Sequence, residues 1–240
     1  MKITVINGTE RKGCTFAMKE MFMAALGQGH EVSEFFLPRD CPHFCSGCKA
    51  CSARDISVCP HAQYTVPLWE NMLAADLLVF TSPTYVGHVT GQMKALLDHY
   101  VTKWTIRSPE KPMFGKQAVV IANASGQGMG RTARDIRDSL DAWGIAYTYT
   151  IKMPLFQPKW KDVPRIVKIT IEKMCKRTAA KVLAKKRIKP RLKIQGHFFA
   201  MRMILLIMNI FERKAGRGPT KDYLYWQENG WFGKKRPWKD

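Results

Sequence analysis

The sequence predicts an α/β fold with a doubly wound, five-stranded parallel sheet, and three observations lead to this prediction. Short β-branched or apolar runs alternate with longer segments of helical apolar spacing. The short runs are apolar almost throughout, as in strands that helices cover on both faces. The chain has 240 residues, of which 46% are hydrophobic, and this is enough for one large domain, or for a domain with an appendage.

Each element follows from its local pattern. The first strand is a β-branched run that ends at Asn7-Gly8, and the first helix stops at Gly27 and Gly29. The expected strands cover residues 2–7, 31–37, 76–80, 117–122 and 145–151, and the expected helices cover residues 14–26, 66–75, 91–103, 131–143 and 163–184. Right-handed crossovers between parallel strands place helices on both faces. Ligands of such sheets bind beyond the carboxyl ends of the strands, which directs attention to the loops there.

The loop after the first strand, residues 8–15, is suited to an anion. It carries two glycines, two threonines and the basic pair Arg11-Lys12 directly before a helix. Backbone N–H groups at a helix N-terminus and the helix dipole favour a phosphate there. The loop matches neither the dinucleotide glycine pattern nor a P-loop. The alternative interpretation is an ordinary capped helix start with Thr15 near the cap.

Two more loops are expected at the same sheet edge. Residues 81–88 contain a proline-fixed turn with Tyr85, Gly87 and His88, which suits contact with a flat ring. Residues 123–130 contain three glycines within five positions, which let a backbone approach a ligand closely. Three such loops on one edge favour a ligand more strongly than any one of them.

Five of the seven cysteines fall in residues 41–61, and four have the spacing Cys45-x2-Cys48-x2-Cys51-x7-Cys59-Pro60. Cysteines at i, i+3 and i+6 can surround one side of a cubane cluster, and bacterial ferredoxins use a similar run. We favour a [4Fe–4S] cluster on these four cysteines. A zinc site and a set of unligated thiols stay open, although zinc sites more often use two separated Cys-x2-Cys pairs. Cys41 is an additional thiol without a role, and we expect His43 and His61 to face solvent.

These motifs together resemble the flavodoxin-like NAD(P)H-dependent FMN oxidoreductases. The resemblance covers residues 1–155, and it rests on Gly8-Thr9-Glu10-Arg11 with Thr15, on Ser82-Pro83-Thr84-Tyr85, and on Met93-Lys94 with Asp98. It implies the strand order 2-1-3-4-5 and a non-covalent FMN. The phosphate would lie on Thr9, Arg11, Gly13, Cys14 and Thr15, and the ring against Pro83, Thr84, Tyr85, Val86 and Gly87 and against Ser125, Gly126, Gln127 and Gly128. The sequence departs from the family pattern at Glu10, where proline is common, and at His99, where arginine is usual.

Within this family, the compact cysteine motif inserted after the second strand resembles the iron–sulfur flavoproteins. The resemblance implies an enzyme that passes electrons between NAD(P)H or ferredoxin, FMN and the cluster, and then to an unknown acceptor. The alternatives are a cluster-free NAD(P)H:FMN or quinone reductase and a non-enzymatic electron carrier. No acid or base is required for this chemistry, so no catalytic residue is assigned, and Tyr85 and His88 are the candidates near the ring.

The charge is concentrated in the C-terminal third. The whole chain has a net charge of +20, yet residues 1–158 carry 16 basic and 13 acidic groups, whereas residues 159–193 carry 14 and 2. Residues 1–190 are expected to form the FMN domain, and residues 191–240 an apolar helix over 198–211 with an aromatic arm. This extension is expected to contact another subunit of a homodimer or homotetramer or an anionic membrane surface; the arm itself would wrap a neighbour and cover its flavin. No nucleic-acid recognition fold is visible, and no signal peptide is seen, which predicts a cytoplasmic protein.

Overall fold

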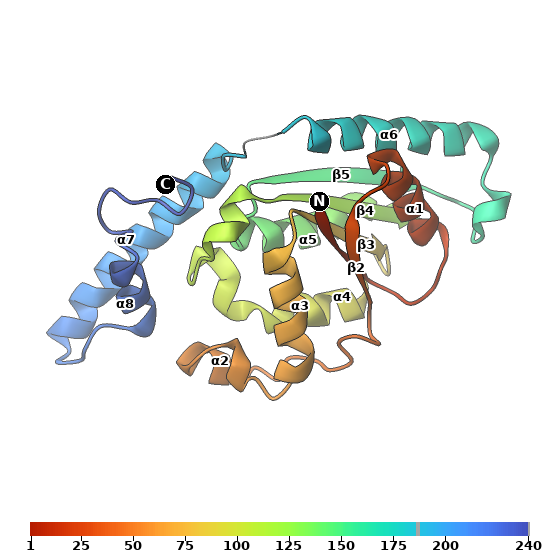
Figure 1. Ribbon diagram of the computed structural model, residues 1–240. Helices are drawn as coiled ribbons and strands as arrows, with labels where there is room; N and C mark the ends of the chain where they lie inside the picture. Colours follow the sequence, from red (N-terminus) through yellow and green to blue (C-terminus); the bar gives the residue numbers. More distant parts are fainter. Residues whose placement is uncertain (186–187, 240) are drawn as a thin grey trace.

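The predicted sheet is present in the computed structural model, which describes residues 1–185 and 188–239. Its order is β2-β1-β3-β4-β5 and every pairing is parallel (Figure 1). The strands are β1 (Lys2–Asn7), β2 (Glu31–Phe36), β3 (Leu77–Pro83), β4 (Gln117–Ala124) and β5 (Tyr147–Pro154). The fold class and the strand order are therefore confirmed, and the winding reverses between β1 and β3.

Helices cover both faces of the sheet. The α-helices are α1 (Cys14–Leu26), α2 (Ala50–Ala53), α3 (Ala62–Ala74), α4 (Gly91–His99), α5 (Met129–Ala142), α6 (Arg165–Leu183), α7 (Leu192–Lys214) and α8 (Lys221–Glu228). Four short 3₁₀ helices are η1 (Ile56–Val58), η2 (Val101–Ile106), η3 (Lys111–Gly115) and η4 (Trp160–Asp162). One core lies between the sheet and α1 with α6, and a second lies between the sheet and α3, α4 and α5. Figure 1 shows α6 above the sheet and α3 and α4 below it.

The expected helix over 91–103 is shorter in the structure. It ends at His99, and η2 follows with a kink at Trp104, Thr105 and Ile106. Thr105 and Ile106 both have positive φ, a conformation that is uncommon outside glycine. Ile106 is nevertheless buried. The apolar pattern therefore extends beyond the end of the α-helix.

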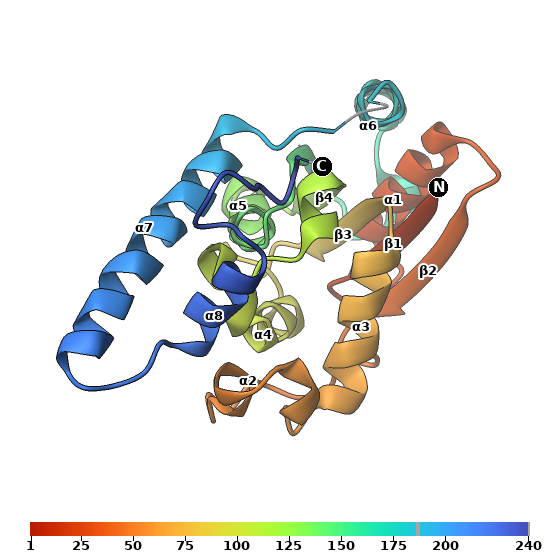
Figure 2. The same cartoon turned by 60° about the vertical axis from the view of Figure 1, so that its left-hand side comes forward.

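A third core joins the C-terminal segment to η2 and η3. Phe198, Trp226 and Trp231 are buried there with Ile106 and Phe114, and the Phe198 and Trp226 rings stack with centroids 4.6 Å apart. Figure 2 shows α8 between α7 and the body of the molecule. The aromatic arm thus packs on its own chain, because its large rings find an apolar surface on α7. The expected contact of the arm with a neighbouring subunit and its flavin stays a prediction. The domain division at residue 190 stays a prediction.

Helix α7 is longer than the apolar run that the sequence shows. It has 23 residues instead of the expected 14 over 198–211, since it begins just after Pro190 and ends before Gly216, which has positive φ. By length and composition it is the one helix of the described residues that could cross a membrane, and 22% of its most apolar window is buried. The apolar run over 198–211 predicts a helix that falls short of the ~20 residues a membrane span needs, and the 23 residues of α7 show that this prediction is wrong on length.

Candidate functional site

A cavity of about 130 Å³ lies where the carboxyl ends of β1, β3, β4 and β5 meet. We call it the rim cavity. Nine of the residues expected at the FMN site line it: Thr9, Arg11, Gly13, Cys14, Thr15, Pro83, Thr84, Tyr85 and Ser125. Ligand pockets usually measure about 300–1,000 Å³, so the rim cavity has room for one end of a cofactor and leaves a ring at its mouth.

The floor of the rim cavity is an anion cradle. Helix α1 begins after Gly13, which offers no side chain to cap the first-turn N–H groups, and such groups favour a phosphate. The Arg11 guanidinium lies beside them and donates to the carbonyl of Pro158 at 3.1 Å. The backbone N–H of Arg11 donates to the Thr9 hydroxyl at 3.2 Å. The residues present therefore fit a phosphoryl group.

Glu10, the acidic departure from the family pattern, does not line the rim cavity and is exposed. Its charge acts on Arg39 instead. The Asp40 hydrogen bond raises the pKa of Arg39, and the charges of Asp40, Glu10 and Glu34 raise it further. The carboxylate thus lies near a cation outside the cavity. It therefore does not place a negative charge against a phosphate bound in the cavity.

Five lining residues lie outside the predicted set: Asn123, Ala124, Leu155, Gln157 and Pro158. Asn123 ties two loops together, because its side chain pairs with the Thr15 hydroxyl and its carbonyl accepts from the Thr84 N–H at 2.8 Å. Leu155, Gln157 and Pro158 follow the fifth strand. Ligands of parallel sheets bind beyond the carboxyl ends of the strands, and this rule applies to the end of the fifth strand as well. The rule could therefore have pointed to these three residues from the sequence.

The remaining predicted residues of the two ring loops do not line the rim cavity. They are Val86, Gly87, Gly126, Gln127 and Gly128. Val86 is fully exposed, at the tip of a turn in which Tyr85 and His88 exchange backbone hydrogen bonds of 2.9 and 3.1 Å. A Cβ on Gly128 would lie 2.9 Å from Thr84 Cγ2 and 3.0 Å from Gly87 Cα. These glycines therefore pack the two loops against each other.

The two candidate catalytic residues differ in surroundings. Tyr85 lines the rim cavity and is half exposed. His88 Nδ1 lies 3.0 Å from Asp135 Oδ2 on α5, outside the cavity. The Asp135 carboxylate also accepts from the Val89 N–H at 3.4 Å, so this carboxylate anchors the turn that carries Tyr85.

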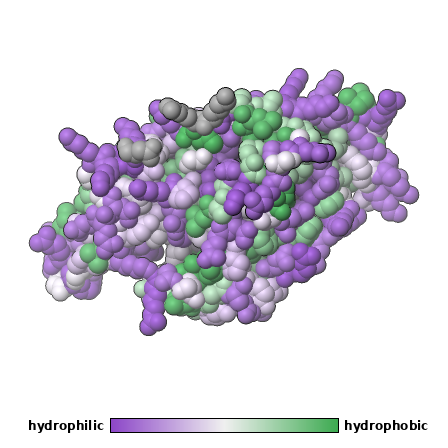
Figure 3. Space-filling model, in the orientation of Figure 1, coloured by the Kyte–Doolittle hydropathy of each residue, from purple (hydrophilic) through white to green (hydrophobic). Residues whose placement is uncertain are grey.

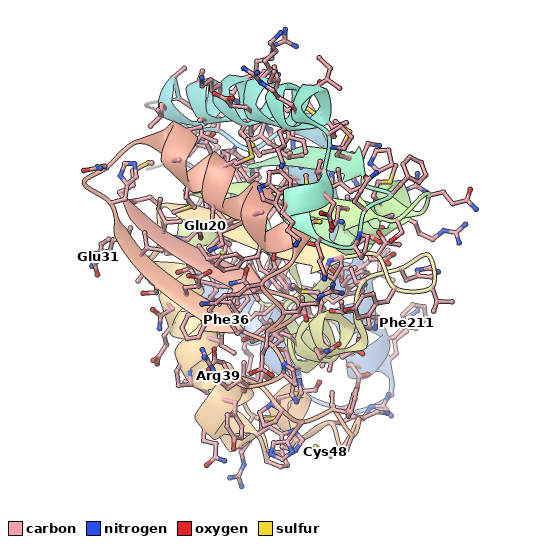
Figure 4. All side chains as sticks on the ribbon, turned by 90° about the vertical axis from the view of Figure 1, so that its right-hand side faces the viewer. Glu20, Glu31, Phe36, Arg39, Cys48 and Phe211 are labelled. Carbon is pink, nitrogen blue, oxygen red and sulfur yellow. The ribbon has the colours of Figure 1, made fainter. Side chains whose placement is uncertain are left out.

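A second cavity, of about 480 Å³, is lined by all four cysteines of the compact motif. We call it the cysteine cavity. Cys45 and Cys48 lie on the loop before α2, Cys51 lies on α2, and Cys59 follows η1. Burial raises the pKa of the Cys51 thiol, and the thiols of Cys59, Cys45 and Cys48 raise it further in that order. The four sulfur atoms therefore share one neighbourhood, and Figure 4 shows Cys48 at the edge of the molecule.

The spacing of the thiols bears on which metal centre fits. Zinc–thiolate bonds of about 2.3 Å place tetrahedral sulfur ligands about 4 Å apart. Among the described residues, the ligand atoms that lie within 4.8 Å of one another belong to Cys59, His61 and His99, and no three of the four motif thiols meet this limit. A cubane cluster holds its thiolates farther apart, because iron and sulfide atoms lie between them. The described thiols are therefore spaced more widely than the ligands of a four-thiolate zinc ion.

Two histidines line the cysteine cavity, and neither was expected to do so. His99 Nδ1 lies 2.7 Å from the Ala95 carbonyl, so it carries the proton and donates. Nε2 of a neutral His99 then accepts from His61 Nδ1 at 2.9 Å. Burial lowers the pKa of His99, which favours this neutral form. His43 is exposed as expected and stacks on His61, with ring centroids 4.7 Å apart.

Helix α4 connects the two cavities. At its N-terminus the Thr90 hydroxyl donates to the Gly8 carbonyl at 2.6 Å, and the Thr90 N–H donates to Ser82 Oγ at 3.2 Å. At its C-terminus His99 lines the cysteine cavity. Nine helical residues span about 13 Å. One rigid element thus fixes the separation between the phosphate loop and the cysteine loop.

The C-terminal segment closes one side of the cysteine region. A cavity of about 310 Å³ beside Cys51 is lined by Trp69, Lys103, Arg107 and Tyr225, among others. Arg107 pairs with Asp222 on α8, and its carbonyl accepts from Trp226 Nε1 at 3.0 Å. The Tyr225 hydroxyl donates to the Pro109 carbonyl at 2.8 Å, and burial raises the pKa of this tyrosine to about 12. Helix α8 is therefore held next to the thiols.

Comparisons with known proteins agree with this geometry. Residues 1–152 match the family described as NADPH-dependent FMN reductase. The chain is 29% identical over 147 residues to an iron-sulfur flavoprotein of Methanosarcina thermophila, a match that covers 60% of this chain and 75% of that one. It is 33% identical over 99 residues to an iron-sulfur flavoprotein of Methanocaldococcus jannaschii, covering 41% of this chain and 50% of the relative.

Solved structures share the fold at low sequence identity. An FMN-dependent NADH-azoreductase from Bacillus anthracis in complex with FMN superposes with a TM-score of 0.55 at 12% identity, and the match covers 76% of this chain and 99% of that one. An NADH:FMN oxidoreductase superposes with a TM-score of 0.53 at 16% identity, covering 77% and 91%. At such identities the likeness shows the flavodoxin-like fold alone.

Proposed function

Because the chain belongs to the NADPH-dependent FMN reductase family and is a flavin oxidoreductase that uses NAD(P)H, we propose that it passes electrons between FMN and a [4Fe–4S] cluster. The FMN would lie at the rim cavity and the cluster in the cysteine cavity. Flavin accepts hydride as a pair of electrons and can release them singly, whereas a cluster carries one electron at a time. The final acceptor is a small molecule or a ferredoxin-like protein.

In this proposal the rim cavity binds FMN by its phosphate. The Arg11 guanidinium and the first-turn N–H groups of α1 neutralise the phosphate, and the Thr9 and Thr15 hydroxyls hydrogen bond to it. Tyr85 and Pro83 lie at the mouth and contact the ring. The exposed side of this turn leaves room for a nicotinamide.

The observation that carries the proposal is the cysteine cavity itself. Four thiols at the expected positions line one cavity, and α4 connects it to the loop under the phosphate. The His61–His99 pair holds the loop after Cys59, and the His61 N–H donates to Cys59 Sγ at 3.4 Å. Hydrogen bonds to ligating sulfur atoms tune the potential of a cluster. The relatives named iron-sulfur flavoprotein support the same assignment.

The test is metal analysis of protein purified without oxygen. We expect about four iron and four sulfide atoms per chain. Cys51→Ser should lose both while keeping FMN, because Cys51 lines the cysteine cavity and not the rim cavity. Cys175→Ser is the matched control, since Cys175 is buried in the core between α1 and α6, and it should keep its iron. One zinc per chain, or no metal in the wild-type protein, would contradict the cluster.

Turnover separates an enzyme from a carrier. Steady-state oxidation of NAD(P)H with a chemical acceptor should proceed through many cycles per chain. The Cys51→Ser variant should still reduce FMN with NAD(P)H but should lose electron transfer to one-electron acceptors. If this variant retained both activities, the cluster-free reductase would be the better description.

A further inference from the structure

The outer side of α7 is apolar and exposed. Seven large side chains on it are between 39% and 64% exposed: Phe199, Met203, Ile204, Ile207, Met208, Ile210 and Phe211. We call this set the α7 apolar face. At 100° per residue these positions spread over about half of the helix circumference. A helix that packs on one neighbour needs an apolar stripe of only about 100°.

The buried contacts of α7 come from another side of the helix. The fold therefore does not depend on the α7 apolar face. Ile194, Phe198, Met201 and Leu205 are buried against Trp226 and Trp231. Between these two sides lies a polar strip with Arg202, whose guanidinium donates to the Phe232 carbonyl. The part of the helix from Ile194 to Leu205 is thus docked on the protein. Within the α7 apolar face, Phe199 meets the Trp238 ring, with centroids 6.3 Å apart, and the Arg236 guanidinium at 5.0 Å, whereas the other six side chains are at least 43% exposed.

Positive charge accompanies this face, because α7 itself carries four Lys or Arg and one Glu within a segment, residues 159–240, whose net charge is +17. Helical spacing places Lys214, in the last turn of α7, on the same side as the α7 apolar face. Lys193, in the first turn, pairs instead with Asp141 on α5 at 2.8 Å. In Figure 3 hydrophilic side chains project along the upper edge of the molecule, where the lysine-rich α6 runs. An exposed apolar face next to basic residues is typical of helices that lie at a lipid surface.

We propose that α7 docks this protein on an anionic lipid bilayer, lying in the interface plane with the α7 apolar face inserted. The apolar side chains would enter the boundary between headgroups and acyl chains, and the lysines would contact acidic headgroups while their stems cover apolar surface. The helix lies on the membrane rather than spanning it, because its other side is occupied by Trp226 and Trp231 and its middle carries Arg202 and Asn209.

Charge favours a bilayer over a second copy of this chain. A symmetric dimer through α7 would bring together two helices that each carry four Lys or Arg and one Glu, and like charges at close range repel. An anionic surface neutralises the same charge and attracts each nearby basic residue. The inference is independent of the redox proposal, since lipid binding can be measured whether or not flavin or metal is bound.

The test is co-sedimentation of the full chain with vesicles. We expect binding to phosphatidylcholine vesicles that contain one third phosphatidylglycerol, and at least tenfold weaker binding to pure phosphatidylcholine. Ile207→Glu should weaken binding to the anionic vesicles by at least tenfold, because it removes an inserted apolar group and adds a repelled charge. Lys214→Ala should weaken it about fivefold and reduce its salt dependence.

Val32→Glu is the matched control. Val32 on β2 is 46% exposed, compared with 48% for Ile207, and it follows Glu31, which Figure 4 shows on the opposite side of the molecule from Phe211. This variant should bind vesicles like the wild type. Equal losses in both variants, or no binding to anionic vesicles, would overturn the proposal. So would a light-scattering mass that shows a dimer broken by Ile207→Glu without vesicle binding, because the face would then be a subunit interface.

Discussion

The rim cavity and the cysteine cavity are both made by loops, yet the sheet controls only one of them. The loops of the rim cavity leave adjacent strand ends, and buried groups such as Thr15, Ser82 and Ala124 fix them. In contrast, no residue from 42 to 60 is buried, and the loop is held by the His61–His99 hydrogen bond and by its own short helices. The comparison teaches that the rim is preorganised, whereas the cysteine loop depends on the metal it would hold.

Removing that metal should loosen the cysteine loop. An iron chelator should make residues 42–60 at least tenfold more sensitive to limited proteolysis, because half-exposed thiols without a shared centre add no bonds to the loop. The rim should keep its FMN, as judged by flavin fluorescence. Equal protection of the loop with and without iron would show that both regions are preorganised.

Two glycine variants, one in a loop at the rim and one in the cysteine loop, test whether the rim is preorganised. Gly128 and Gly47 both have positive φ, but only at Gly128 would a Cβ meet neighbouring atoms within 3.0 Å. We expect Gly128→Ala to weaken FMN binding about 100-fold, from roughly 3 kcal/mol of strain and overpacking. Gly47→Ala should leave the FMN affinity unchanged. Fluorescence titration measures both, and circular dichroism checks that the variants are folded.

A buried thiol should make the stability of the protein depend on pH. Burial raises the pKa of Cys175 from 9.0 to about 11, so the unfolded chain loses this proton first as the pH rises. The free energy of unfolding should therefore be unaffected below pH 9 and fall by about 2–3 kcal/mol toward pH 11. Urea unfolding of Cys175→Ala should show a correspondingly smaller pH dependence. Val182→Ala, in the same core, should keep it; an identical slope in all three proteins would contradict the assignment.

The smallest expected effect concerns the charge at the rim cavity. Arg11→Ala should weaken FMN binding about tenfold, because one exposed, charge-assisted contact to the phosphate is lost. The iron content of the cysteine cavity should not change. Arg39→Ala is the control, since Arg39 pairs with Asp40 outside the cavity. Similar FMN affinities for both variants would place the phosphate elsewhere.

Much of the rim could be predicted because its geometry follows from local patterns. Apolar runs give the strands, and parallel strand ends must converge, so Thr9, Arg11, Pro83 and Ser125 were expected in one place and line one cavity. The prediction omitted Gln157 and Pro158 because the loop after β5 carries no glycine and no hydroxyl side chain that would indicate a binding site. Gly128 was expected against a ring, whereas its contacts are with Thr84 and Gly87.

The strand order was expected only from the family resemblance. The sequence by itself determined the alternation of strands and helices, the glycine- and threonine-containing loop before α1 and the grouping of four cysteines in one loop. These features depend on spacing along the chain, which is local information. Only the tertiary structure decided that His99 meets His61 at the cysteine cavity, that α4 joins the two cavities, and that the C-terminal aromatic rings fold onto α7 of their own chain. Those contacts join residues that are 28 or more positions apart or lie at opposite ends of one helix, and packing rather than periodicity brings them together.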